Sequence, residues 1–179
     1  IAADLLAQAE HGGDSVVGFV TTSSRLLKQV EKEVACQLER LSRAEYIGES
    51  LGKAGFAVLV RSIDEAIRIC NDFSPEHLSL VVKDEGRRLS QIRTAGAIYL
   101  GNTSAIAVGD FLAGPSHTLP TGGAGKSFSG LRADQFQRRT SIVRMDQAAV
   151  RKSLPAVQEF ARMEGLDAHG ESVRLRVER

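Results

Sequence analysis

The stretch GDFLAGPSHTLPTGGAG, residues 109–125, decides how the rest of the chain is arranged. Seven of the 17 glycines and two of the four prolines fall between Gly101 and Gly130. Glycine loses much backbone entropy when it is fixed, and proline lacks an amide donor, so such a stretch is disfavoured inside helices and central strands. It predicts a long loop, and long loops in compact domains are usually functional or disordered.

Two residues of this stretch indicate function. Asp110 follows Gly109, and His117 lies between Ser116 and Thr118. A carboxylate and an imidazole on one glycine-shaped loop can be brought to one point. The alternative is an aspartate that stabilises a turn and a histidine at the surface.

Strands and helices alternate before this loop. Apolar, β-branched runs predict strands at 15–22, 56–60, 78–82 and 97–101. Apolar residues at helical spacing predict three helices, one from Ser23 or Ser24 to about Leu41, one over 64–73 and one over 84–95. Residues 43–55 could form a helix or a loop, and the continuous apolar run at 56–60 suggests a strand buried on both faces. This order predicts an α/β fold with a mostly parallel sheet flanked by helices. Ligands of such sheets collect at the carboxyl ends of the strands, where the 109–125 loop emerges.

The amino-terminal residues predict a helix that Gly12 and Gly13 end. Gln8 and His11 are three positions apart near its end, which places them on one helical face. A polar pair of this kind can share one ligand. The alternative is a solvated polar surface.

Glu76 and His77 lie between a helix and a strand. Pro75 disfavours helix at the residue before it, so the preceding helix should stop at Phe73 or Ser74. The backbone is still turning at a strand entrance, so both side chains can border one cleft. A carboxylate beside an imidazole suits general acid–base chemistry. The alternative is a turn residue beside a histidine that only fills a structural role.

The character of the sequence changes after Gly130. A short extended stretch is expected at 140–144, and Asp146 can cap a helix that runs toward Glu164 and that Pro155 kinks or splits. A turn at 165–170 should hold His169. We therefore expect an α/β domain at 1–130 and a mainly helical arm at 131–179. The arm has little apolar surface of its own, so it should dock on the first domain or on a second subunit.

Composition excludes several classes of function. The 23 Lys and Arg nearly balance the 22 Asp and Glu, and only 5% of residues are aromatic, which argues against a dedicated nucleic-acid binder. No apolar run has the length of a membrane span, and no signal segment opens the sequence. Cys36 and Cys70 have no metal or redox spacing, and we expect both to be buried, reduced thiols in a cytoplasmic protein.

The four histidines share one pattern. Each lies at an element boundary or in a glycine- or proline-marked turn, near an acid or an amide: His11 with Gln8, His77 with Glu76, His117 with Asp110, and His169 with Glu164. Two imidazoles and a carboxylate make a good site for a borderline metal ion, and zinc is the first choice for nitrogen and oxygen ligands. The spacing matches neither a zinc finger nor an HExxH helix.

Four motifs together resemble one known family. AQAEHG at 7–12, SPEHL at 74–78, GDFLAGPSHTLPT at 109–121 and EGLDAHG at 164–170 are similar to histidinol dehydrogenase, in the order of that family. The resemblance covers essentially the whole chain but only the carboxyl-terminal part of the family's chain. No GxGxxG fingerprint follows a strand, and residues 121–125 do not form one. The resemblance thus implies an incomplete Rossmann-like domain in a fragment that lacks most of the NAD-binding half.

The resemblance implies a role for each motif residue. Gln8, His11 and Asp110 resemble three zinc ligands, and His169 resembles the fourth, which the family takes from the neighbouring subunit of a homodimer. Glu76 and His77 resemble the two proton acceptors. His117 and Glu164 resemble contacts to the substrate, and His77 and the four zinc ligands resemble such contacts too. Like His169, Glu164 would contact the substrate in the site of the neighbouring subunit. The residues that bind NAD stay unassigned.

The implied activity is oxidation of L-histidinol to L-histidine through L-histidinaldehyde, with zinc and two NAD⁺, in the last steps of histidine biosynthesis. One alternative is a related zinc and NAD dehydrogenase of another small alcohol. Another is a truncated, non-catalytic module that binds metal or dimerises. We expect the isolated fragment to be inactive.

Overall fold

The computed structural model describes residues 1–178, which divide into two compact units, one of residues 1–136 and one that starts at Gln137. The first unit contains ten helices and strands: α1 (Ala2–Ala9), β1 (Gly18–Thr21), α2 (Ser24–Leu38), α3 (Ala44–Ala54), β2 (Phe56–Leu59), α4 (Ile63–Phe73), β3 (His77–Leu80), α5 (Glu85–Leu89), β4 (Ala97–Leu100) and α6 (Ile106–Phe111). Short 3₁₀ turns follow at Ala124–Lys126 and Ala133–Phe136. The second unit contains α7 (Gln147–Glu164) and α8 (Asp167–Val177).

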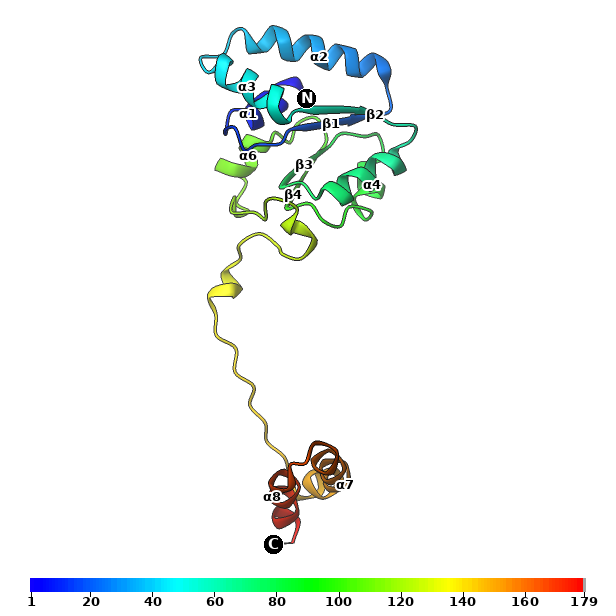
Figure 1. The fold of residues 1–179 in the computed structure, drawn as a ribbon, viewed down its shortest axis with the longest axis vertical. Coiled ribbons are helices and arrows are strands. Elements are labelled where there is room, and N and C mark those ends of the chain that lie inside the picture. The colour runs from blue at the N-terminus through cyan, green and yellow to red at the C-terminus, as the bar shows by residue number, and fades with distance from the viewer. Residues whose placement is uncertain (179) are drawn as a thin grey trace. The chain divides into compact units, whose positions relative to one another are not determined.

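The four strands form two parallel pairs, β1 with β2 and β3 with β4. This confirms the α/β class and the parallel pairing predicted from the sequence. Within residues 1–178 the strands do not join into one sheet. Figure 1 shows α2 and α3 on one side of the β1–β2 pair and the β3–β4 pair on the other.

The core of the first unit forms where α1 and α3 meet the chain that leads into β1. Leu6, Ala9, Val17 and Ile47 are buried together, and side chains of α2 and α3 pack around them. The buried Ser50 hydroxyl donates a hydrogen bond to the Gly12 carbonyl oxygen at 3.1 Å, which joins α3 to the end of α1. The helix predicted for the amino-terminal residues is therefore confirmed, and Leu6 and Ala9 are its contribution to the core.

Strand β2 is not buried on both faces, which corrects the prediction. Ala57 is exposed and the Leu59 side chain is 51% exposed, while Phe56 and Val58 are half-buried. α2 packs near this pair. Alternate residues of a strand point to opposite faces, so a helix on one side buries only one of the two sets.

Two segments differ from the predicted helices. Residues 44–54, left open as helix or loop, form α3. The helix expected at 84–95 stops at Leu89. The Asn71 side chain donates to the Gln91 carbonyl oxygen at 2.9 Å and accepts from the Arg93 backbone nitrogen at 2.8 Å. These bonds capture backbone groups that a longer helix would use.

Gly109 and Asp110 lie inside α6, and the loop begins after this helix. The prediction of a loop from Gly109 was therefore wrong at its start. Helix interiors disfavour glycine by only about 1 kcal/mol, and a tight contact described below requires glycine here.

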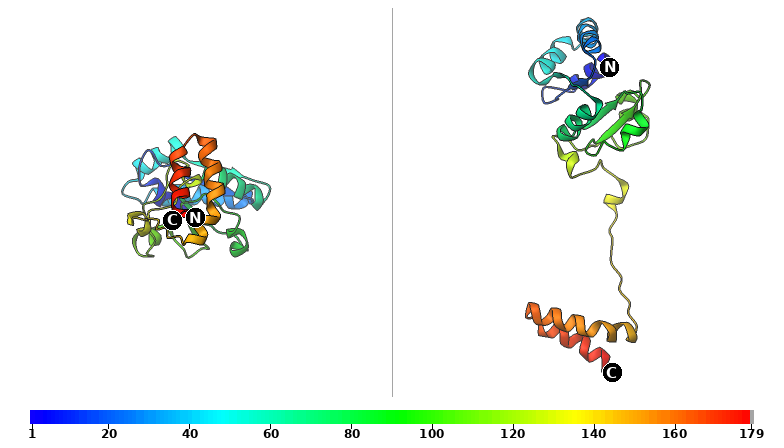
Figure 2. Two further views of the ribbon diagram at one scale, coloured as in Figure 1. Left: turned by 90° about the horizontal axis from the view of Figure 1, so that it is seen from below. Right: turned by 90° about the vertical axis from the view of Figure 1, so that its right-hand side faces the viewer.

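In the second unit, α7 and α8 pack side by side as a helical hairpin, which Figure 2 shows from the side. Asp146 caps α7 as predicted, because its carboxylate accepts from the Ala149 backbone nitrogen at 2.7 Å. α7 continues through Pro155 without splitting, and Gly165 ends it in the left-handed conformation, with φ 68°. Gly170 is buried and lies against Ala161, so small residues let the two helices approach.

Two predictions for this unit were wrong. Residues 140–144 form no strand, and His169 lies in α8 and not in a turn, because the turn ends at Leu166. Over residues 1–178, no helix is long and apolar enough to cross a membrane.

Candidate functional site

One face of the β3–β4 pair holds the candidate site. The parallel register sets His77 beside Ala97 and Ser79 beside Tyr99. Side chains two apart on a strand share a face, so His77 and Tyr99 are diagonal neighbours. The small Ala97 leaves space between them. The imidazole and phenol rings lie with centroids 6.0 Å apart and planes tilted by 45°.

Helix α6 closes over this face. A Cβ on Gly109 would lie 2.3 Å from Cε1 and 2.4 Å from the hydroxyl oxygen of Tyr99. The backbone of Gly109 therefore rests directly on the phenol ring, and this close approach explains a glycine inside the helix. The next residue, Asp110, places its Oδ1 atom 3.3 Å from Nε2 of His77.

The His77 imidazole is buried without a complete set of partners. Its side chain is 14% exposed and that of Asp110 is 17% exposed. Although Nε2 is close to Asp110 Oδ1, it forms no hydrogen bond to any group of residues 1–178, and it is fully covered. A buried polar atom of this kind costs free energy unless a ligand, an ion or a water molecule pairs with it.

Glu76 stands at the entrance of β3, next to His77. Its carbonyl oxygen accepts from the Ala97 backbone nitrogen at 2.8 Å, and Gly96 donates to the Pro75 carbonyl oxygen at 2.9 Å. A Cβ on Gly96 would lie 2.7 Å from the Glu76 carbonyl oxygen and 3.1 Å from Pro120. The 112–123 loop therefore packs against the strand entrance that carries the proposed acid–base pair.

The turn before Glu76 has an unusual conformation. Ser74 is buried and has φ 58°, and it is the one non-glycine residue with positive φ among residues 1–178. Its hydroxyl donates to the Thr94 carbonyl oxygen at 2.8 Å. Gly125, in the 3₁₀ turn that follows the loop, lies against both groups. Left-handed backbone costs free energy for residues with a Cβ, so the surrounding bonds hold this turn in place.

Tyr99 is a site residue that the sequence analysis missed. Burial raises the pKa of its phenol, and the negative charges of Asp110 and Glu76 raise it further. Tyr99 therefore lies within the electric field of both carboxylates. Strand alternation on 97–100 could have found it, since a tyrosine two residues after a small alanine shares that residue's face.

Gln8 and His11 lie one turn apart at the end of α1, where the His11 backbone nitrogen donates to the Gln8 carbonyl oxygen at 3.3 Å, and their shared ligand stays a prediction. Gln8 is half-buried in the last turn of α1, whereas the exposed His11 lies beyond the cap residue Glu10. The chain turns away after His11, at Gly12, which has φ 137° and lies close to the Tyr46 hydroxyl.

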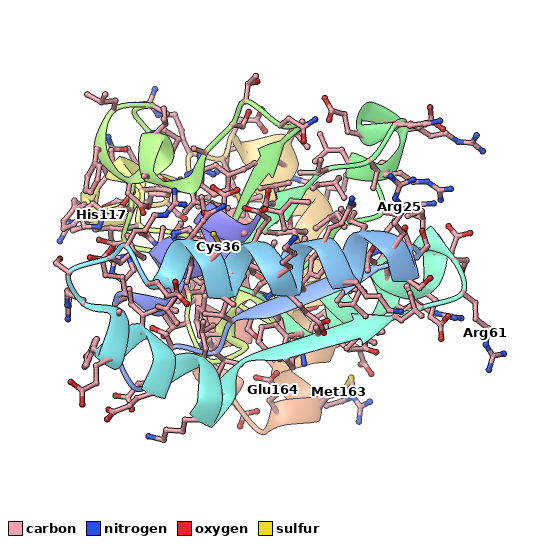
Figure 3. The ribbon with its side chains drawn as sticks, turned by 90° about the horizontal axis from the view of Figure 1, so that it is seen from above. Arg25, Cys36, Arg61, His117, Met163 and Glu164 are labelled. Atoms are coloured by element: carbon pink, nitrogen blue, oxygen red, sulfur yellow. The ribbon has the colours of Figure 1, made fainter. Side chains whose placement is uncertain are left out.

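Three further predicted residues are exposed. His117 lies in the loop after α6, and Figure 3 shows it at the surface of the first unit. Glu164 ends α7 and His169 lies in the first turn of α8, so both belong to the second unit. The structure brings His77 and Asp110 together and places Glu76 next to His77 at the start of β3, and the roles of all the predicted site residues stay predictions.

The donor chemistry of the first unit fits zinc. Across residues 1–178, no group of three or more His, Cys, Asp or Glu side chains is placed to hold a metal ion. Gln8, His11 and Asp110 offer an amide oxygen, an imidazole nitrogen and a carboxylate, which are ligand types that zinc accepts. A fourth protein ligand would come from outside this set.

These features define an α/β protein in which an imidazole and a carboxylate meet on one face of a parallel strand pair, as in enzymes that move protons. The histidinol dehydrogenase family profile matches residues 1–177, and the chain belongs to this family. Histidinol dehydrogenase from Bacillus cereus is 42% identical over 178 residues, and that from Moorella thermoacetica is 41% identical. Each alignment covers 99% of this chain and 42% of the relative.

A solved structure agrees with these relatives. The crystal structure of histidinol dehydrogenase from Elizabethkingia anophelis matches with a TM-score of 0.95 at 34% identity, over 99% of this chain and 41% of that one. The chain thus spans well under half the length of the proteins it resembles, and it corresponds to one part of them.

Proposed function

We propose that this chain forms the acid–base part of an enzyme that oxidises L-histidinol to L-histidine through L-histidinaldehyde. The observation that carries the proposal is the buried Nε2 atom of His77, which has no hydrogen bond and lies 3.3 Å from Asp110. Membership of the histidinol dehydrogenase family supports the choice of substrate.

The first oxidation requires a base for the hydroxyl proton of histidinol. His77 is suited to this task because its Nε2 atom, although close to Asp110, forms no hydrogen bond within residues 1–178. It takes the proton while the carbinol carbon loses a hydride, and the aldehyde forms. The packed strand pair fixes the imidazole, which limits the reorganisation needed during transfer.

The second oxidation requires water. Glu76 stands at the mouth of β3, half-buried and next to His77. Its carboxylate takes a proton from the water that adds to the aldehyde, and the hydrate then loses a second hydride to give the acid. Two proton acceptors at one strand entrance thus serve two steps in turn.

Zinc and NAD⁺ are the cofactors of this proposal. Gln8, His11, Asp110 and His169 would hold the zinc ion. When bound, zinc attracts the nitrogen donors of the substrate and NAD⁺ provides the hydride acceptor. Asp110 would thereby keep the substrate close to His77, its neighbour in the structure. His117 and Glu164 would contact the substrate.

The proposal includes a homodimer in which Glu164 and His169 act on the partner's site. The second unit supports this role, since Phe160, Met163 and Leu166 are 64%, 67% and 41% exposed. Apolar side chains exposed near the two proposed site residues favour docking against another protein surface. A twofold dimer offers an identical surface to each copy.

The direct test is NADH formation from L-histidinol by the complete gene product and by the 179-residue chain alone. We expect turnover from the first and none from the second, since residues 1–178 contain no dinucleotide fingerprint. Other small alcohols serve as controls for the substrate. Preference for another alcohol would contradict the histidinol assignment, and robust turnover by the short chain would contradict its expected inactivity.

A mixing experiment tests the dimer. Subunits with His169→Ala and subunits with His11→Ala should each be inactive as homodimers. A heterodimer of the two then carries one site with both defects and one intact site, so activity should return toward half of the unmodified enzyme. Heterodimers without recovery would show that His169 does not complete the partner's site.

A further inference from the structure

We infer that Tyr99 is a positioning residue whose ring, rather than its hydroxyl group, sets the separation between His77 and Asp110. The inference concerns the packing of β4 against α6, and only its catalytic consequence rests on the proposed function. Neither motif nor family membership assigns Tyr99 a role.

The contact that carries this inference is between the ring and the backbone of α6. Gly109 approaches Tyr99 so closely that even a methyl group would lie 2.3–2.7 Å from three atoms of the phenol. The ring is therefore the surface on which this part of α6 rests. Interiors are packed too densely for a helix to keep its place when such a surface is removed.

The geometry transmits this contact to the site. Asp110 follows Gly109 directly, so the height of Gly109 above β4 also sets the position of the Asp110 carboxylate. His77 lies diagonally across the same strand face, with its ring centroid 6.0 Å from that of Tyr99. The phenol thus borders both members of the pair that stand 3.3 Å apart.

The ring makes the larger part of this contact, with two of the three nearest atoms, and the hydroxyl group of Tyr99 forms no hydrogen bond within residues 1–178. Its oxygen instead lies against the Gly109 backbone. Phenylalanine keeps the ring and loses only this oxygen, so it should keep the spacing. Alanine removes the ring that separates β4 from Gly109, so it should change the spacing.

The first unit offers a matched control. The Phe56 ring lies against Gly18 as the Tyr99 ring lies against Gly109, with 2.3 Å from the would-be Cβ in both cases. Phe56→Ala therefore removes an aromatic ring of the same kind from the β1–β2 pair, which has no candidate catalytic residue. This control shows how much activity is lost when an aromatic ring is removed and the fold is destabilised, without any change at His77 and Asp110.

The experiment compares Tyr99→Ala, Tyr99→Phe and Phe56→Ala in the complete gene product, with rates expressed per folded subunit. For Tyr99→Ala we expect kcat/KM for histidinol to fall on the order of 100-fold, the effect of a displacement of about 1 Å. Zinc affinity, measured by competition with a chelating dye, should fall about 10–100-fold. Tyr99→Phe and Phe56→Ala should stay within about threefold in both measurements.

Crystal structures of the three variants make the inference independent of the proposed function. Tyr99→Ala should widen the gap between His77 Nε2 and Asp110 Oδ1, and the other two variants should keep it. An unchanged gap in Tyr99→Ala, or equal losses in the Ala and Phe variants, would overturn the inference. Absence of histidinol oxidation in the unmodified protein would instead contradict the proposed function, while the measured gap still decides the role of Tyr99.

Discussion

The two strand pairs of the first unit have the same architecture and different contents. Each pair is parallel, and its two strands are joined by helical connections. In each pair an aromatic ring packs closely against a glycine: Phe56 against Gly18, and Tyr99 against Gly109. In the β1–β2 pair both partners of that contact are on the strands. In the β3–β4 pair the glycine is on a helix that crosses the face, and the next residue is Asp110.

The connections that lead from a helix into a strand also differ between the two pairs. α3 is followed by Gly55 and then at once by β2, whereas Ser74, Pro75 and Glu76 separate α4 from β3. The longer connection places a carboxylate at the strand entrance and bends sharply at Ser74. The two strand pairs are similar, so the strands themselves do not explain why only the β3–β4 pair holds a candidate site. The difference lies in helix α6, which crosses its face, and in the longer connection before β3.

The largest effect should come from removing the two proposed proton acceptors of the β3–β4 pair. His77→Asn should slow alcohol oxidation and Glu76→Gln should mainly slow aldehyde oxidation, each by about 10²–10⁴-fold. Thr21→Ala, at a buried strand position of the first pair, is the control and should leave both half-reactions unchanged per folded subunit. Separate assays with histidinol and histidinaldehyde measure this, and equal losses in both would refute the division of labour.

A smaller effect should come from filling the two matched glycines. Gly109→Ala and Gly18→Ala each place a methyl group 2.3 Å from an aromatic ring, so each should destabilise the fold by about 1–3 kcal/mol. Only Gly109→Ala should also lower kcat/KM, by roughly 100-fold, because it moves Asp110. Denaturant unfolding and steady-state kinetics measure the two quantities. If Gly18→Ala lowers kcat/KM equally, the two pairs do not differ as described.

The buried serines allow a comparison of stability alone. Ser50 and Ser74 are each 2% exposed, and each hydroxyl donates to a distant carbonyl oxygen. Removing either bond should cost about 1–3 kcal/mol. Alanine gains helix propensity at 50 but keeps the left-handed strain at 74, so Ser74→Ala should be the more destabilising change.

The variant Ser74→Gly serves as the control for this explanation. Glycine loses the same hydroxyl group but adopts positive φ without strain, so it should recover part of the stability lost in Ser74→Ala. Urea unfolding of the three variants measures the difference. A glycine variant less stable than the alanine variant would show that backbone strain at residue 74 is unimportant.

The smallest effect concerns thiol reactivity. Cys36 is exposed on the outward side of α2, seen in Figure 3, whereas burial on α4 raises the pKa of the Cys70 thiol. The thiolate is the reactive form, so at pH 8 Cys70 should react with iodoacetamide on the order of tenfold more slowly than Cys36. The rate at Cys70 should rise as pH increases toward its raised pKa. Single-cysteine variants, Cys36→Ser and Cys70→Ser, measure each rate, and equal rates would contradict the burial of Cys70.

Local sequence patterns predicted the elements better than the contacts among them. The apolar runs located all four strands, and the capping role of Asp146 was correct. The end of α5 was missed because it depends on hydrogen bonds of the Asn71 side chain with Gln91 and Arg93, which lie 20 and 22 positions further along the chain. The expectation that Cys36 is buried was wrong for the same reason, since burial depends on what packs against the helix.

The candidate site follows a similar division. The juxtaposition of Glu76 and His77 is visible in the sequence, but the contact of His77 with Asp110 depends on how α6 crosses the strands. Glycine at 109 looked like a loop signal because the sequence does not show the ring that approaches it. Tyr99 was missed because it belongs to no motif, although its strand position gave the necessary signal.

The strand registers also have a consequence for the order of folding. Pairing Gly18 with Phe56 closes a segment about twice as long as pairing His77 with Ala97. Each doubling of a closed segment costs about 0.6 kcal/mol of chain entropy. We therefore expect β3–β4 to form first, so the Gly101 amide, bonded to Leu80, should gain protection from hydrogen exchange before the Val60 amide, bonded to Thr21. The face that carries His77 and Tyr99 would then serve as the nucleus on which the rest of the unit condenses, so a substitution that weakens the candidate site should also slow folding.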